Sequence, residues 1–171
     1  MPSEVTTFRI DKDVIERLKK EADEKEISLN ALINQILRRY IEWELYEKKL
    51  GMISIPKQLV KELCKLLPEE EIIRLGEKMG KNMLADIIVF MKGRIDQETF
   101  ISWLDARLKH SSLEVNHCYD DNNHTIIIKH DLGEKWSLYH KIVFELIFHE
   151  LLNKHVDIEY NENVLKLSFT L

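Results

Sequence analysis

A six-residue segment near the N-terminus constrains this chain more than any other feature. Residues 5–10 are rich in β-branched and aromatic side chains, which favours a strand. Side chains alternate along a strand, so this one has two faces. One face carries Thr6, Phe8 and Ile10, and the other carries Val5, Thr7 and Arg9. A lone strand of this length cannot bury its apolar face or pair its own backbone groups, so we expect a second copy of the chain to supply its neighbour.

Two helices are predicted to follow the strand and to cover its apolar face. The first spans Lys12 to about Lys25, with Asp11 as its N-cap, and the second begins after Ser28 and ends at Gly51. Apolar residues recur at helical spacing, at Val14, Leu18 and Ala22 and then at Leu29, Leu32, Ile33, Ile36, Leu37, Tyr40 and Ile41. The second helix would be a rod of roughly 30 Å. We expect its second half to join two parts of the molecule.

The outward face of the paired strands has the chemistry to read DNA. Two copies paired antiparallel about a two-fold axis form a two-stranded ribbon, which fits the major groove of B-DNA. Arg9 can offer two donors to guanine, Thr7 can hydrogen-bond, and Val5 can contact a thymine methyl group. We therefore expect Val5, Thr7 and Arg9 to contact bases. The alternative is a solvated strand face with no partner.

The motif residues of the N-terminal quarter are similar to those of a known family. They are Thr6-Thr7-Phe8-Arg9-Ile10-Asp11, then Val14-Ile15-x-x-Leu18, then Ile27-Ser28-x-x-Ala31-Leu32-Ile33. Over about residues 5–45 the chain resembles the ribbon-helix-helix (Arc/MetJ-like) family of DNA-binding proteins. The resemblance implies an obligate dimer. It also implies that backbone N–H groups around Ser28, Leu29 and Asn30 hold a DNA phosphate, a role that suits a helix N-terminus.

Three charged residues bear on this phosphate contact. The family usually has Gly just before the hydrophobic residue and serine that start the second helix, whereas this chain has Glu26 before Ile27-Ser28. A carboxylate there weakens the phosphate contact unless it points away. Lys12 and Lys25 could reach the DNA backbone, although exposed lysines are more often solvated. We take Lys12 as a candidate phosphate-binding residue.

The overall charge works against strong binding to random DNA. The chain of 171 residues has a formal net charge of −5, with 10 basic and 11 acidic residues in positions 1–50 and 15 and 19 in positions 51–171. Neither part is basic, so DNA binding must come from local placement of charge and should be sensitive to salt. No signal peptide or membrane-spanning segment is recognised, and we expect a cytoplasmic protein.

Residues 51–171 predict a second domain of the α+β class, so the domains are expected at 1–50 and 51–171. The predicted order is ααα-ββ-α-ββ with an antiparallel sheet. This order of elements is similar to the order in small-molecule-sensing domains of the vinyl-reductase type, although no motif is shared. The helices are Pro56 to about Leu67, Pro68 to about Met91, Asp96 to about His110, and 134–153; the strands are Leu113–Tyr119, Thr125–His130, Val156–Tyr160 and Val164–Phe169. We expect this domain to sense an unidentified small-molecule effector or to add dimer contacts.

Two side-chain groups in this second domain raise other functions. His117, Cys118, His124 and His130 surround a hairpin and could hold a metal, but their spacing fits no strong template, so we expect no metal and no cofactor. At the turn before residue 134, His130 and Lys135 could bind an anion, or the turn and Trp136 could simply anchor the helix, the interpretation we favour. Cys64 and Cys118 are expected to be buried thiols without a disulfide.

The sequence thus predicts a dimeric, sequence-specific transcription regulator that binds double-stranded DNA and is not an enzyme. No catalytic motif is recognised. Whether dimers pair into tetramers stays open. The alternative is a protein–protein adaptor, such as an antitoxin-like partner, in which the ribbon domain mainly dimerises. The net negative charge favours that alternative.

Overall fold

The chain divides into two compact units, with the boundary between Leu45 and Tyr46. A computed structural model describes residues 4–111 and 113–170. The boundary lies inside the second predicted helix rather than at residue 50.

The first unit is a pair of helices preceded by an extended segment. Helix α1 spans Lys12–Glu24 and helix α2 spans Leu29–Arg39, continued by a π-helical turn over Tyr40–Glu44. Residues 4–10 form neither a helix nor a strand, and no described residue pairs with them. The predicted strand is therefore not confirmed in the single chain. A strand needs a neighbouring strand to receive its hydrogen bonds, and the sequence predicts that neighbour in a second copy.

The second predicted helix ends where expected. The short helix α3 (Leu45–Glu47) is followed by a turn that closes at Gly51, whose φ is 69°. The N–H of Met52 donates to the Glu47 carbonyl at 3.0 Å, which is the long hydrogen bond of a helix end closed by a left-handed residue.

The second unit begins with four helices. They are α4 (Lys57–Leu66), α5 (Glu69–Lys78), α6 (Leu84–Lys92) and α7 (Gln97–His110), with a π-helical turn over Met79–Met83 joining α5 to α6. Asp96 caps α7 as predicted: it accepts the Thr99 N–H at 2.9 Å, while Thr99 Oγ1 accepts the Asp96 N–H at 2.9 Å. Gly93, with φ 81°, ends α6.

The rest of the unit is a four-stranded antiparallel sheet with a helix between its two hairpins. Strands β1 (Glu114–Asp120) and β2 (Asn123–Lys129) form the first hairpin, and β3 (Val156–Tyr160) and β4 (Val164–Thr170) form the second. Helix α8 (Glu134–Leu146), extended by a π-helical turn over Ile147–Leu151, connects them. The strand order is β1-β2-β4-β3, so β2 and β4 are central. The predicted α+β class, hairpins and antiparallel sheet are confirmed.

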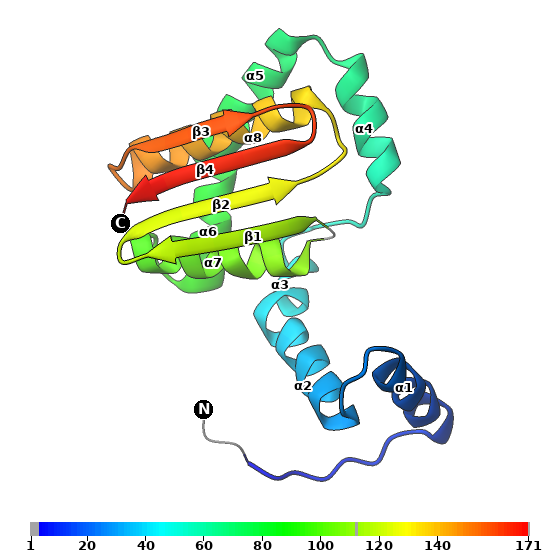
Figure 1. The fold of residues 1–171 in the computed structure, drawn as a ribbon. Helices are drawn as coiled ribbons and strands as arrows, with labels where there is room; N and C mark the ends of the chain where they lie inside the picture. The colour runs from blue at the N-terminus through cyan, green and yellow to red at the C-terminus, as the bar shows by residue number, and fades with distance from the viewer. Residues whose placement is uncertain (1–3, 112, 171) are drawn as a thin grey trace. The chain divides into compact units, whose positions relative to one another are not determined.

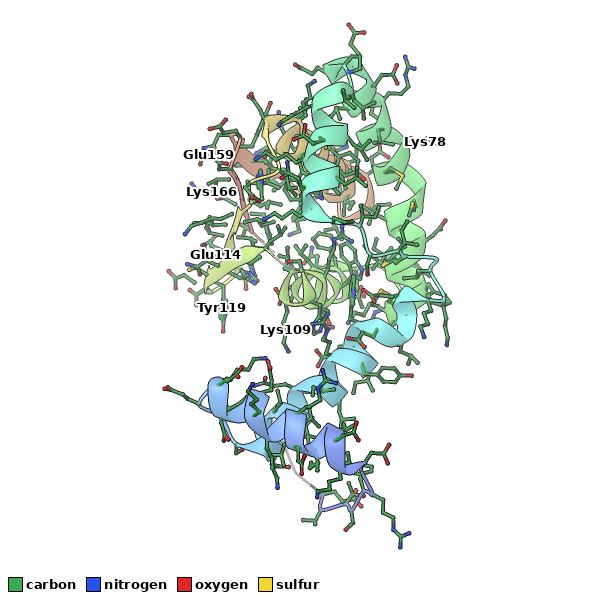
Figure 2. All side chains as sticks on the ribbon, turned by 90° about the vertical axis from the view of Figure 1, so that its right-hand side faces the viewer. Lys78, Lys109, Glu114, Tyr119, Glu159 and Lys166 are labelled. Carbon is green, nitrogen blue, oxygen red and sulfur yellow. The ribbon has the colours of Figure 1, made fainter. Side chains whose placement is uncertain are left out.

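The core of the second unit lies between one face of the sheet and the helices behind it (Figure 1). Buried residues alternate along β2 and β4 and pack with aromatic residues of α7 and of the π-helical turn that extends α8. They include Ile126, Ile128, Leu165 and Leu167 from the strands and Phe100, Trp103 and Phe148 from the helices. The other face of the sheet is polar. Figure 2 shows Glu114, Glu159 and Lys166 on that side, where Lys166 Nζ donates to Glu159 at 2.6 Å.

Candidate nucleic-acid interface

The turn between α1 and α2 has the backbone of a glycine-closed helix end, although it holds glutamate. Glu26 has φ 54°, in the left-handed region. Its N–H donates to Asp23 at 3.1 Å, and the Ile27 N–H donates to Ala22 at 3.0 Å, the two hydrogen bonds of a Schellman motif. A side chain in this conformation costs roughly 1–2 kcal/mol, which glycine avoids. The structure thus gives a physical reason for the glycine that the ribbon-helix-helix family usually has at this position.

Replacing this glutamate should therefore test both backbone strain and charge. Glu26→Gly is expected to raise the free energy of unfolding by about 0.5–1 kcal/mol, because relief of strain exceeds the added entropy of glycine in the unfolded chain. Urea denaturation measures it. Glu26→Ala is the matched control, since it removes the carboxylate and keeps the strained Cβ. If Glu26→Ala stabilises the protein as much as Glu26→Gly, the backbone explanation is wrong.

The start of α2 offers the unbonded donors that the phosphate prediction requires. Ser28 caps the helix: its Oγ accepts the Ala31 N–H at 3.1 Å, and its carbonyl accepts the Leu32 N–H at 3.0 Å. No acceptor among the described residues takes the N–H groups of Leu29 and Asn30. Free N–H groups at the positive end of a helix attract anions. Ser28, Leu29 and Asn30 thus lie together at a helix N-terminus, as predicted.

The basic residues of this unit are mostly compensated by acids. Lys12 Nζ lies 3.8 Å from Glu16, and Lys25 Nζ lies 2.9 Å from Glu21. This lysine lowers the pKa of the Glu21 carboxyl. Arg39 Nε lies 2.8 Å from Glu44. These pairs are exposed and worth little in stability, so a phosphate could replace the acid.

Asp11 occupies the predicted N-cap position of α1 but its side chain makes no capping hydrogen bond. Its carbonyl accepts the Ile15 N–H at 3.0 Å instead. The position was predicted from residue type, whereas a cap also needs the side chain to turn towards the helix.

The candidate base-reading residues and the apolar residues beside them are all exposed. Val5 is 97% exposed and Phe8 61%, and Thr7 and Arg9 are exposed as well. Other large apolar residues of this unit are exposed too: Ile10, Val14, Ile36, Leu37, Tyr40 and Ile41. Soluble proteins rarely leave so many apolar groups uncovered on so small a unit. The arrangement within one chain is incomplete unless something covers these residues.

The four candidate metal ligands do not come together. His117 and His124 are neighbours, with Nε2 and Nδ1 3.0 Å apart, but Cys118 lies on the opposite face because side chains alternate along β1. His130 lies past the far end of β2 from His124. Among the residues that the structure describes, no group of three or more His, Cys, Asp or Glu could hold a metal ion.

The pair of histidines is instead held by a carboxylate. Asp105 Oδ1 lies 2.9 Å from His117 Nδ1, so it can accept that N–H. His117 Nε2 then accepts the Nδ1–H of His124, whose ring stacks on Phe169 with centroids 5.1 Å apart. Burial, and secondarily the neighbouring His117, lowers the pKa of His124. Both rings thereby have hydrogen-bond partners, which gives this cluster a structural role.

The turn before α8 is a structural lock rather than an anion site. His130 Nδ1 accepts the Leu132 N–H at 3.2 Å, so the ring proton is on Nε2 and is donated to Ser137 Oγ at 2.8 Å. Ser137 in turn donates to the Asn161 carbonyl at 2.7 Å. This direction is the reverse of a nucleophilic serine, whose hydroxyl proton must go to the histidine. Burial and the charge of Lys57 hold the pKa of His130 below its ordinary value.

Lys135 has a structural partner too. Its Nζ donates to the carbonyls of Lys65 at 3.1 Å and Leu67 at 2.5 Å, at the C-terminal end of α4. A cation there satisfies carbonyls that the helix leaves unbonded. The structural interpretation of this turn, with Trp136 stacked between His130 and His140, is the one the geometry favours.

Burial of His140 predicts that acid destabilises the protein. Burial, and secondarily Arg107, lowers the pKa of His140 to about 3. Between this value and 6.5 the unfolded chain binds the proton and the folded chain does not, so stability falls as pH falls below 6.5. We expect the free energy of unfolding of His140→Phe to fall less steeply between pH 6.5 and 5 than that of the parent protein, by about 1 kcal/mol per pH unit. Urea denaturation at several pH values checks it; an unchanged slope contradicts it.

Neither cysteine is buried as expected. Both are free thiols; Cys64 is half-buried, and burial raises the pKa of its thiol, while Cys118 is exposed on the outer face of the sheet. The prediction of no disulfide is confirmed, and the prediction of burial is wrong for Cys118 because strand alternation turns it away from the helices.

In comparisons with known proteins, no family model matches this sequence and no curated protein matches it. Among the described residues, no helix is long and apolar enough to cross a membrane.

Proposed function

We propose that this protein is a transcription regulator that binds double-stranded DNA as a homodimer, through a ribbon-helix-helix module formed by two copies of residues 5–45. The single observation that supports it most is the exposure of Phe8 and Ile10 on an unpaired segment beside exposed apolar residues of α1 and α2. Pairing two copies would bury these side chains and leave Val5, Thr7 and Arg9 pointing outward for the major groove.

The turn geometry supports the same proposal independently. The α1–α2 connection ends in a left-handed residue and is followed at once by a serine-capped helix with free N–H groups at Leu29 and Asn30. Such an N-terminus suits a DNA phosphate, which would fix the ribbon in the groove. Residues 46–171 would then serve as an effector-sensing or oligomerisation domain.

Selection of genomic fragments by the purified full-length protein tests this proposal. We expect recovery of fragments that share a repeated half-site, because a two-fold symmetric dimer reads a two-fold symmetric sequence. Binding to these fragments should fall steeply as salt rises. Failure to retain any fragment, even at low salt, would count against DNA binding.

A protein–protein adaptor is the second candidate, and charge is the observation that favours it. The chain has a net charge of −5, and Lys12 and Lys25 are each paired with a glutamate. In this case the same dimer would form, yet the salt titration would show no binding to random or genomic DNA. The two functions therefore give opposite results in one experiment.

A further inference from the structure

A charged residue occupies the apolar, inward-facing stripe of helix α7. Phe100, Trp103, Leu104 and Arg107 follow helical spacing, and the first three are at most 1% exposed. Arg107 continues this stripe and is half-buried. Burial lowers the pKa of its guanidinium, and the nearby Tyr139 opposes that effect. A cation partly withdrawn from water on such a stripe is costly unless an anion compensates it.

No anion of the described part of the chain compensates Arg107. No described carboxylate lies within 4.0 Å of its guanidinium, and no described acceptor takes any of its N–H groups. Its guanidinium lies over the ring of Trp103, with 5.7 Å from Cζ to the centroid. His140 adds no second positive charge beside Arg107, because a histidine with a pKa of about 3 is neutral at physiological pH.

A second unsatisfied donor lies on the indole that Arg107 covers. Trp103 is 1% exposed, and its Nε1 has no hydrogen-bond partner among the described residues. Buried N–H groups in proteins nearly always have an acceptor, and leaving one unpaired costs about 1–3 kcal/mol. Two neighbouring groups thus have no acceptor in the described part of the chain: a buried indole N–H and a half-buried guanidinium.

The geometry points to a binding site for a small organic carboxylate at Arg107 and Trp103, between α7 and Tyr139 of α8. A carboxylate matches the planar fork of a guanidinium and can accept the indole N–H as well. One negative charge balances one arginine, whereas a phosphate dianion would leave a charge uncompensated. The neighbouring aromatic side chains, Trp103 and Tyr139, suit a ligand with an apolar body. The site deepens the sensing role proposed for residues 46–171, yet ligand binding itself does not depend on DNA.

Calorimetric titration of the full-length protein tests the site, with sodium benzoate as the aromatic probe and sodium octanoate as the aliphatic one. We expect saturable binding of at least one, with benzyl alcohol at least about tenfold weaker than benzoate if the ligand is aromatic, since it lacks the charge. Binding of octanoate alone would assign the site to aliphatic acids. No saturation by either carboxylate up to about 10 mM would overturn the proposal, as would tighter binding of inorganic phosphate.

Variants then connect binding to the two donors. Arg107→Met keeps the length of the side chain and removes the charge, and Trp103→Phe removes the N–H and keeps an aromatic ring; each should weaken binding of the carboxylate at least about tenfold. Arg74→Met on α5 is the matched control, because that arginine is 74% exposed and pairs with Glu71. Circular dichroism checks folding, and Arg107→Lys serves if Arg107→Met does not fold. Parent-like affinity in folded Arg107 and Trp103 variants would overturn the assignment, whatever the DNA experiments show.

Discussion

Replacing Ile36 with glutamate is expected to leave the protein monomeric and to abolish its DNA binding. Ile36 is 46% exposed on α2, among the apolar residues that a second copy would cover in the proposed dimer. Symmetry places the new carboxylate in the interface twice, and each buried charge costs several kcal/mol. We expect the dissociation constant of the dimer to rise at least about 100-fold, measured by analytical ultracentrifugation.

Gln35→Glu is the control for this variant. It adds the same charge to the neighbouring residue of the same helix, where the side chain is polar and exposed. We expect it to remain dimeric. A parent protein that is monomeric at micromolar concentration, or an Ile36→Glu protein that dimerises like Gln35→Glu, would remove the basis of the ribbon interpretation.

Arg9→Ala is expected to remove sequence selectivity while the dimer stays intact. Arg9 is exposed and lies outside the apolar set, so its loss should not affect pairing. Each bidentate contact with guanine contributes about 1–3 kcal/mol of discrimination, and the dimer has two. The ratio of specific to non-specific affinity should therefore fall by at least about 30-fold, measured by competition binding at fixed salt.

Lys12→Ala separates base reading from backbone attraction. The Lys12 side chain is 90% exposed, and we expect it to contribute only charge. Its loss should weaken binding to all sequences alike. The slope of log affinity against log salt concentration should decrease by the amount that corresponds to about one phosphate contact per copy. Selectivity that survives in Arg9→Ala, or that is lost in Lys12→Ala, would reassign the base-reading role.

Local signals in the sequence predicted much of the fold. Turn residues between short apolar runs gave both hairpins, Asp96 gave the start of α7, and Gly51 and Gly93 gave two helix ends. These features depend on neighbours a few residues apart, and the chemistry that sets them is visible in the sequence. The pairing of β2 with β4 is different, since it joins strands separated by the whole of α8.

The side-chain clusters were harder to predict for the same reason. His117, Cys118, His124 and His130 are close in sequence, but only His117 and His124 meet, because strand alternation turns Cys118 away and the length of β2 separates His130 from them. Ser137, which is bonded to His130, and Asn161, whose carbonyl accepts from Ser137, come from other elements. The unusual position of Arg107 is visible in the sequence, since its place four residues after Trp103 puts a charge on the apolar stripe of its helix.

By itself the sequence determined the order of helices and hairpins, because periodicity and turn chemistry act over short distances. The two-faced strand at residues 5–10 and the ribbon it would form stay predictions. Only the tertiary structure decided that His130 is locked to Ser137, that Cys118 is turned outward, and that Arg107 and Trp103 Nε1 lie together without an acceptor in the described chain. These outcomes depend on which faces of distant elements meet, and burial then sets the cost of every polar group left between them.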